Sequence, residues 1–62
     1  MPSIMVGGPT CDVDQKRKLA ERLADVAAEI YRLPKEAITV VIQESPPENV
    51  GIGGVLLVDR KH

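Results

Sequence analysis

The spacing of apolar positions changes along the chain, and each change predicts a different element. Residues 3–6 form a short apolar stretch that ends at a Gly-Gly-Pro sequence, residues 7–9, which is typical of a strand followed by a turn. Between residues 13 and 33 the apolar positions recur at steps of three and four, which predicts an amphipathic helix. These positions are Leu19, Leu23, Val26, Ile30 and Leu33, with Ala20 and Ala27 beside them.

Both ends of this helix carry sequence signals. Asp12 and Gln15 have the spacing of a capping box, in which each side chain bonds to the backbone of the other, so the helix should begin near Val13. Pro34 disfavours helical geometry in the residue before it. The helix should therefore end near Arg32.

The second half of the chain predicts a strand and then a bent arm. Residues 37–44 are rich in β-branched side chains, and their number suits a strand. Strand, helix and strand in this order predict two parallel strands joined by a right-handed crossover. Residues 45–49 should form a loop, and the glycine-rich residues 50–58 should form a hairpin or strand arm. Alternation assigns Ile38, Val40 and Ile42 to one face of the second strand, and Thr39, Val41 and Gln43 to the other.

These elements predict one α/β (α+β) domain over residues 1–62, a single β-α-β unit followed by a hairpin or strand arm. One helix covers only one face of such a sheet, so Val41 on the other face and the apolar residues 55–58 would remain exposed in a monomer. A chain of 62 residues buries only about 60% of its unfolded surface, and this one has no Phe or Trp to enlarge the core. We therefore expect self-association, with the arm as the main contact between subunits.

Composition excludes several classes of protein. A formal net charge of −1 lacks the basic excess of nucleic-acid binders, so we expect no nucleic-acid partner. Cys11 is the single cysteine and His62 the single histidine, so we expect no disulfide within the chain, no metal site and no cofactor. No apolar run approaches the ~20 residues that span a bilayer, and residues 3–6 are too short for the core of a signal peptide. We expect no membrane association and a cytoplasmic location.

Pro2 is the candidate for chemistry, because it directly follows Met1. Removal of the methionine would leave a secondary amine at the start of the chain. An α-amino group has a pKa of about 7.7–8.0, and an apolar or cation-rich pocket lowers it, so such an amine could be a neutral base at physiological pH. Proline makes up about 5% of average sequence, so its position could also be a coincidence. Features elsewhere in the chain must distinguish a catalytic Pro2 from a coincidence.

Several features at characteristic positions resemble those of the 4-oxalocrotonate tautomerase family, the short-chain group of the tautomerase superfamily. They are Pro2, the helix opening Asp14-Gln15-Lys16, Pro34, Glu44 and the segment Gly51-Ile52-Gly53-Gly54. The likeness extends over nearly the whole chain. It implies a β-α-β fold with a C-terminal hairpin, assembled as a hexamer built from dimers, with active sites at subunit boundaries.

The resemblance also implies an activity. The chain would be an isomerase that shifts a proton between oxygen and carbon of a small enolisable 2-oxo or 2-hydroxy acid, with Pro2 as the catalytic general base. A small-molecule carboxylate would be the substrate, no cofactor would be needed, and the reaction would belong to aromatic catabolism. The family also needs cations that hold the substrate carboxylates.

This sequence departs from the family at the positions that assist the proline. Thr10-Cys11 and Thr39 stand where the family usually has arginines, and Val50 stands where it has an aromatic residue. Thr39 and Val50 are therefore substrate-binding candidates by position, although a threonine in a strand can also simply fit the pleat. Threonine cannot replace a bidentate arginine, so we expect inefficient turnover of the dicarboxylate hydroxymuconate. The alternative function is a catalytically silent oligomeric binding or structural protein on the same scaffold.

Other polar residues have ordinary structural interpretations beside the functional ones. Glu44 could assist acid-base chemistry or could be a carboxylate at a strand end, and Cys11 is better explained as a small loop residue than as a reactive thiol. Six cations could reach a site or could be solvated charges, and we favour the second interpretation. They are Lys16, Arg17, Lys18, Lys35, Arg60 and Lys61.

Overall fold

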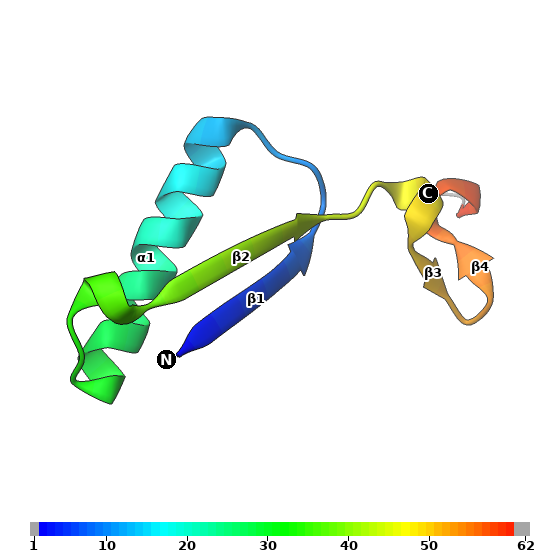
Figure 1. Cartoon of the computed structure of the whole chain (residues 1–62). Helices are drawn as coiled ribbons and strands as arrows, with labels where there is room; N and C mark the ends of the chain where they lie inside the picture. The colour runs from blue at the N-terminus through cyan, green and yellow to red at the C-terminus, as the bar shows by residue number, and fades with distance from the viewer. Residues whose placement is uncertain (1, 61–62) are drawn as a thin grey trace.

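The computed structural model describes residues 2–60 and confirms the β-α-β unit with a C-terminal hairpin. Figure 1 shows helix α1 beside the two long strands, with the hairpin projecting beyond their carboxyl ends. Short 3₁₀ turns separate the later elements. The elements are β1 (Ser3–Gly8), α1 (Val13–Tyr31), η1 (Lys35–Ala37), β2 (Thr39–Glu44), η2 (Pro47–Asn49), β3 (Gly51–Ile52), β4 (Val55–Leu56) and η3 (Leu57–Asp59).

Strands β1 and β2 pair in parallel over their whole length, from Ser3 opposite Thr39 to Gly8 opposite Glu44. The first strand is therefore longer than predicted, because Gly7 and Gly8 continue the ladder instead of forming a turn. The second strand is shorter than predicted. It begins at Thr39 because residues 35–37 are wound into the turn η1.

Both ends of α1 lie where the sequence predicts them. The Asp12 side chain accepts a hydrogen bond from the Gln15 N–H at 2.8 Å, and the Gln15 side chain accepts one from the Asp12 N–H at 3.1 Å, which confirms the capping box. At the other end Arg32 takes the left-handed conformation with φ 59° and caps the helix. Its N–H donates to the carbonyl of Ala28.

The core of a single chain is very small. Among residues 2–60 only Ala24 and Ala27 are buried, and both lie on the side of α1 that faces the sheet. Val40 and Ile42 are half-buried beneath the helix, as predicted for that face of β2. On the opposite face Met5 and Val41 pair across the sheet and are 73% and 45% exposed. One face of the sheet is thus bare, as the sequence predicts.

The prediction that the apolar positions of the helix form its buried face is wrong for part of the helix. Val26 and Ile30 are 54% and 73% exposed, whereas Leu19 and Leu23 are half-buried. A two-stranded sheet is narrow, and Val26 lies about 100° around the helix from the buried Ala27. The apolar arc of α1 is therefore wider than the sheet that one chain provides.

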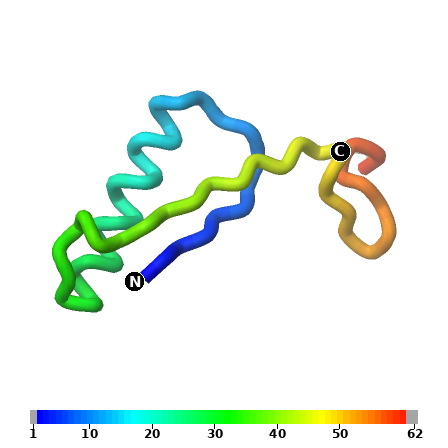
Figure 2. Tube along the Cα trace, viewed as in Figure 1, coloured from blue at the N-terminus to red at the C-terminus, as the bar shows by residue number. Residues whose placement is uncertain are grey.

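The hairpin forms an arm that leaves the body of the chain, as Figure 2 shows. Gly53 and Gly54 connect β3 to β4 with φ of 62° and 85°, a pair of positive angles that a two-residue hairpin turn requires and glycine adopts without strain. The second hairpin strand is shorter than the predicted apolar run, because residues 57–59 turn into η3. The radius of gyration is 14.9 Å, against about 10.6 Å for a compact chain of this length. The base of the arm meets the carboxyl ends of the strands, and the rest of the arm extends away from the body of the chain.

Within the described part of the chain, no helix has the length and apolarity that crossing a membrane requires.

Candidate active site

Two of the three predicted site residues lie next to each other at the amino end of the sheet. Pro2 directly precedes β1 and is half-buried, and its carbonyl accepts a hydrogen bond from the Thr39 N–H at 3.1 Å. Thr39 is the first residue of β2, and its side chain is exposed. The parallel register thus fixes the start of the chain against the second strand. Met1, whose removal the proline chemistry requires, lies outside the described residues.

Val50, the third predicted residue, lies at the opposite end of the molecule. It is half-buried between η2 and β3, and its carbonyl accepts a hydrogen bond from the Leu57 N–H at 2.8 Å. Strand β1 alone has 6 residues, which separates Pro2 from this region by about 20 Å at the usual rise per residue. A single chain does not bring Val50 to Pro2.

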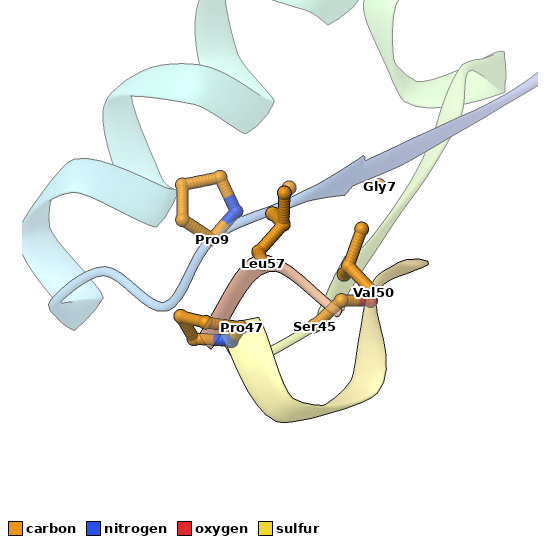
Figure 3. A pocket seen from close by; sticks show the side chains of 7 residues that line it. Gly7, Pro9, Ser45, Pro47, Val50 and Leu57 are labelled. Atoms are coloured by element: carbon orange, nitrogen blue, oxygen red, sulfur yellow. The ribbon is translucent and has the colours of Figure 1, made fainter. Parts of the chain in front are cut away.

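Val50 instead lines a pocket of about 420 Å³ where the arm meets the carboxyl ends of the strands. Figure 3 shows the side chains around it. Carbon atoms form nearly the whole wall, and the hydroxyl of Ser45 is the exception among the lining side chains. The lining residues are residues 7–9, Ser45, Pro47, Val50 and Leu57.

Backbone hydrogen bonds bring these segments together. The Ser45 N–H donates to the carbonyl of Gly8 at 2.8 Å, which holds the start of the loop against the end of β1. The hydrogen bond between Leu57 and Val50 closes the base of the arm. The sequence missed Pro9, Pro47 and Leu57 as site residues because no periodicity marks a pocket made from three separate segments. The available signal was the grouping of prolines around the glycine-rich turns.

Among residues 2–60 no charged side chain lines this pocket, and three of the candidate cations are paired with carboxylates. Lys16 pairs with Glu44, Arg17 with Asp14 at 2.6 Å, and Lys35 with Asp25 at 2.9 Å. These pairs favour the solvated or structural interpretation of those cations.

Lys35 shows how such a pair changes titration. Its hydrogen bond to the Asp25 side chain raises the pKa of Lys35 above the ordinary lysine value, and the nearby charges of Asp25, Glu21 and Glu36 act in the same direction. Desolvation opposes this shift and is outweighed. Among residues 2–60, no group of three or more His, Cys, Asp or Glu side chains is placed to hold a metal ion.

Comparison with known proteins agrees with this architecture. The Tautomerase family, described as "Tautomerase enzyme", matches residues 3–60. A Listeria innocua protein named "Probable tautomerase" is 38% identical over 42 residues, which are 68% of this chain and 69% of that protein.

Solved structures extend the likeness to three dimensions. DmpI from Archaeoglobus fulgidus is 53% identical, with a TM-score of 0.86 over 94% of this chain and 100% of its own. A heterohexameric 4-oxalocrotonate tautomerase from Chloroflexus aurantiacus is 26% identical, with a TM-score of 0.87 over 98% of this chain and 100% of its own. The family match over residues 3–60 and the shared fold lead to one conclusion: the chain belongs to the tautomerase family and is a tautomerase-type isomerase.

Proposed function

We propose that this chain catalyses the keto-enol isomerisation of a small enolisable 2-oxo or 2-hydroxy acid, with the ring nitrogen of Pro2 as general base once Met1 is removed. The observation that carries the proposal is the position of Pro2. It lies half-buried at the entry to β1, directly before residues 3–60, which match the tautomerase family.

The chemistry needs one base and returns it unchanged. The uncharged nitrogen of Pro2 takes the proton of the enol hydroxyl, and the electron pair of that O–H bond moves to form the carbonyl. The protonated nitrogen then delivers the proton to the carbon that gains a C–H bond as the enol double bond is lost. A partly buried amine loses hydration, which favours its uncharged form and supports this role.

The site requires a second copy of the chain, because Pro2 and the pocket lie at opposite ends of β1. In the described structure β1 pairs only with β2, so its outer edge offers unpaired backbone groups. Two copies related by a two-fold axis can pair β1 with β1 in antiparallel fashion over residues 3–8. Ser3 of one copy then lies opposite Gly8 of the other. This arrangement would bring Pro2 of one copy to the pocket wall at Pro9 of the other.

Exposed apolar side chains support the same assembly. Among residues 2–60, eleven large apolar residues are exposed, and they occupy the bare sheet face, α1 with the segment that follows it, and the arm. A soluble monomer rarely exposes so much apolar surface. We propose a homo-oligomer, and a hexamer by analogy with the Chloroflexus aurantiacus protein, which is a heterohexamer. A cytoplasmic location stays a prediction from composition, and a role in aromatic catabolism stays an implication of the family resemblance.

Ketonisation of phenylenolpyruvate, followed by ultraviolet absorbance, tests the catalytic proposal. The protein is first shown by intact mass to begin at Pro2. A chemically synthesised chain with an acetylated Pro2 nitrogen keeps the ring but has no base, so its rate should fall by about 10²–10⁴-fold, the usual contribution of a general base. A Pro2→Ala variant retains a primary amine and should lose less activity.

Ser3→Ala is the matched control, because Ser3 follows Pro2 and carries no base. Its rate should equal that of the wild type. Equal rates for the acetylated and free chains would contradict the proposal and would favour the silent binding or structural protein.

A further inference from the structure

We propose that the pocket at the base of the arm binds an uncharged apolar group of the substrate, an aryl or branched alkyl group, and rejects a second carboxylate. This inference rests on the proposed function, because it assigns the pocket to the substrate on which Pro2 acts. It goes further by defining a class of substrate, the apolar monocarboxylates.

The wall of the pocket carries the first argument. Pro9, Pro47, Val50 and Leu57 present only carbon from their side chains, and Ser45 adds one hydroxyl. A carboxylate that enters such a site loses its hydration and finds no cation among the described residues of the wall. An aryl or alkyl group carries no charge that must be dehydrated, and the burial of its apolar surface stabilises the complex.

The size of the pocket carries the second argument. Its volume of about 420 Å³ falls in the range of small-molecule sites, which is about 300–1,000 Å³. An apolar cavity of about 150 Å³ is enough to bind benzene. The pocket therefore has room for an aromatic ring and a short chain, while the single carboxylate and the reacting carbon remain at its mouth.

The charges beside the pocket carry the third argument. Glu44 directly precedes the lining residue Ser45, and Glu48 directly follows Pro47, so two carboxylates flank the wall in sequence. Lys16 is the cation that the structure places at Glu44, and it is paired with that carboxylate. Clamping a substrate carboxylate with Lys16 would require breaking this pair. Lys16 is thus not free to hold a second carboxylate at this side of the wall.

Binding of unreactive acids tests the inference without any turnover. The assembled wild-type protein is titrated with 3-phenylpropanoate and, separately, with hexanedioate, by calorimetry and by NMR of backbone amides. We expect 3-phenylpropanoate to bind at least about tenfold more tightly, which corresponds to about 1.4 kcal/mol. The amides of Ser45, Val50 and Leu57 should shift. Equal or tighter binding of hexanedioate, binding of neither acid, or shifts confined to other regions would overturn the inference.

Substitutions at Val50 sharpen this test. Val50→Leu keeps the wall apolar and should retain binding of 3-phenylpropanoate within about threefold, whereas Val50→Lys should weaken it and improve binding of hexanedioate. If Val50→Lys fails to assemble, the comparison of the two acids on wild-type protein still decides. Retention of the wild-type preference by an assembled Val50→Lys protein would contradict the assignment of this wall.

Failure of the inference can be told apart from failure of the proposed function. If 3-phenylpropanoate binds in the pocket but no turnover depends on the Pro2 nitrogen, the pocket assignment stands and the isomerase proposal fails. If Pro2-dependent turnover is as efficient with 2-hydroxymuconate as with phenylenolpyruvate, the isomerase proposal stands and the selectivity inferred here fails.

Discussion

Lys16 in the first turn of α1 forms an ion pair with Glu44, the last residue of β2. The two residues are 28 positions apart, and their side chains are 32% and 31% exposed. Glu44 precedes Ser45, which lines the pocket. The pair therefore ties the amino end of the helix to the edge of the candidate binding site.

We predict that Lys16→Met lowers the free energy of unfolding by about 0.5–1 kcal/mol, toward the upper end of values for exposed pairs. A double-mutant cycle with Glu44→Gln, measured by urea unfolding, should give a coupling energy of similar size. Arg17→Met is the control, because Arg17 and Asp14 are 70% and 79% exposed and should couple less. A coupling energy of zero for Lys16 and Glu44 would show that the pair is only a surface contact.

The capping box predicts a specific loss when Asp12 is replaced. Asp12→Ala removes the acceptor for the Gln15 N–H and should destabilise the protein by about 0.5–2 kcal/mol. Asp12→Asn keeps an oxygen acceptor and should retain most of the stability. Thermal unfolding at fixed protein concentration measures both variants. If both lose the same stability, the charge of Asp12 matters more than its hydrogen bond.

The Lys35–Asp25 pair predicts a dependence on alkaline pH. The folded state raises the pKa of Lys35 and so binds its proton more tightly than the unfolded chain does. The pair thus contributes fully below the ordinary lysine pKa of about 10.4 and is lost as pH rises through the raised value.

Urea unfolding from neutral to strongly alkaline pH should detect this loss. Asp25→Ala removes both the hydrogen-bond acceptor, which raises the pKa of Lys35 most, and the carboxylate charge, so the stability of the variant should fall less steeply over the same range. Parallel curves for the two proteins would count against a role of the pair. Protein concentration must be held constant, because association also changes the apparent stability.

The bare sheet face predicts an effect on assembly. Met5→Glu or Val41→Glu places a charge among exposed apolar side chains and should shift the protein toward smaller species in analytical ultracentrifugation. Lys18→Glu, on the exposed side of α1, is the control and should leave the sedimentation coefficient unchanged. An unchanged oligomer in the Met5 and Val41 variants would show that this face is not an interface.

Local signals in the sequence predicted the order of elements and the bounds of the helix. Asp12, Gln15 and Pro34 act through neighbouring backbone, so their effect can be recognised without knowing the tertiary structure. The length of β1 could not be recognised in this way. Gly7 and Gly8 have the composition of a turn, and only pairing with β2 holds them in the strand.

The helix face and the site depend on contacts between distant segments, and sequence patterns describe those poorly. The apolar pattern counts Val26 and Ile30 as buried because it records every face that is eventually covered, including faces that one chain cannot cover. The sequence predicted Pro2 and Thr39 as site residues on separate grounds, and only the parallel register of β1 and β2 shows that they are neighbours. The pocket wall at Pro9, Pro47 and Leu57 was not predicted, since it forms where the base of the arm meets the carboxyl ends of the strands.

A core made of two alanines changes how mutational tolerance should be judged in this protein. In most small domains, solvent accessibility in one chain indicates which positions accept polar replacements. Here the exposed apolar residues of the sheet face, helix flank and arm outnumber the buried ones, so accessibility would rank many intolerant positions as permissive. Evolution should therefore restrain these outward-facing positions as strictly as an ordinary protein restrains its interior.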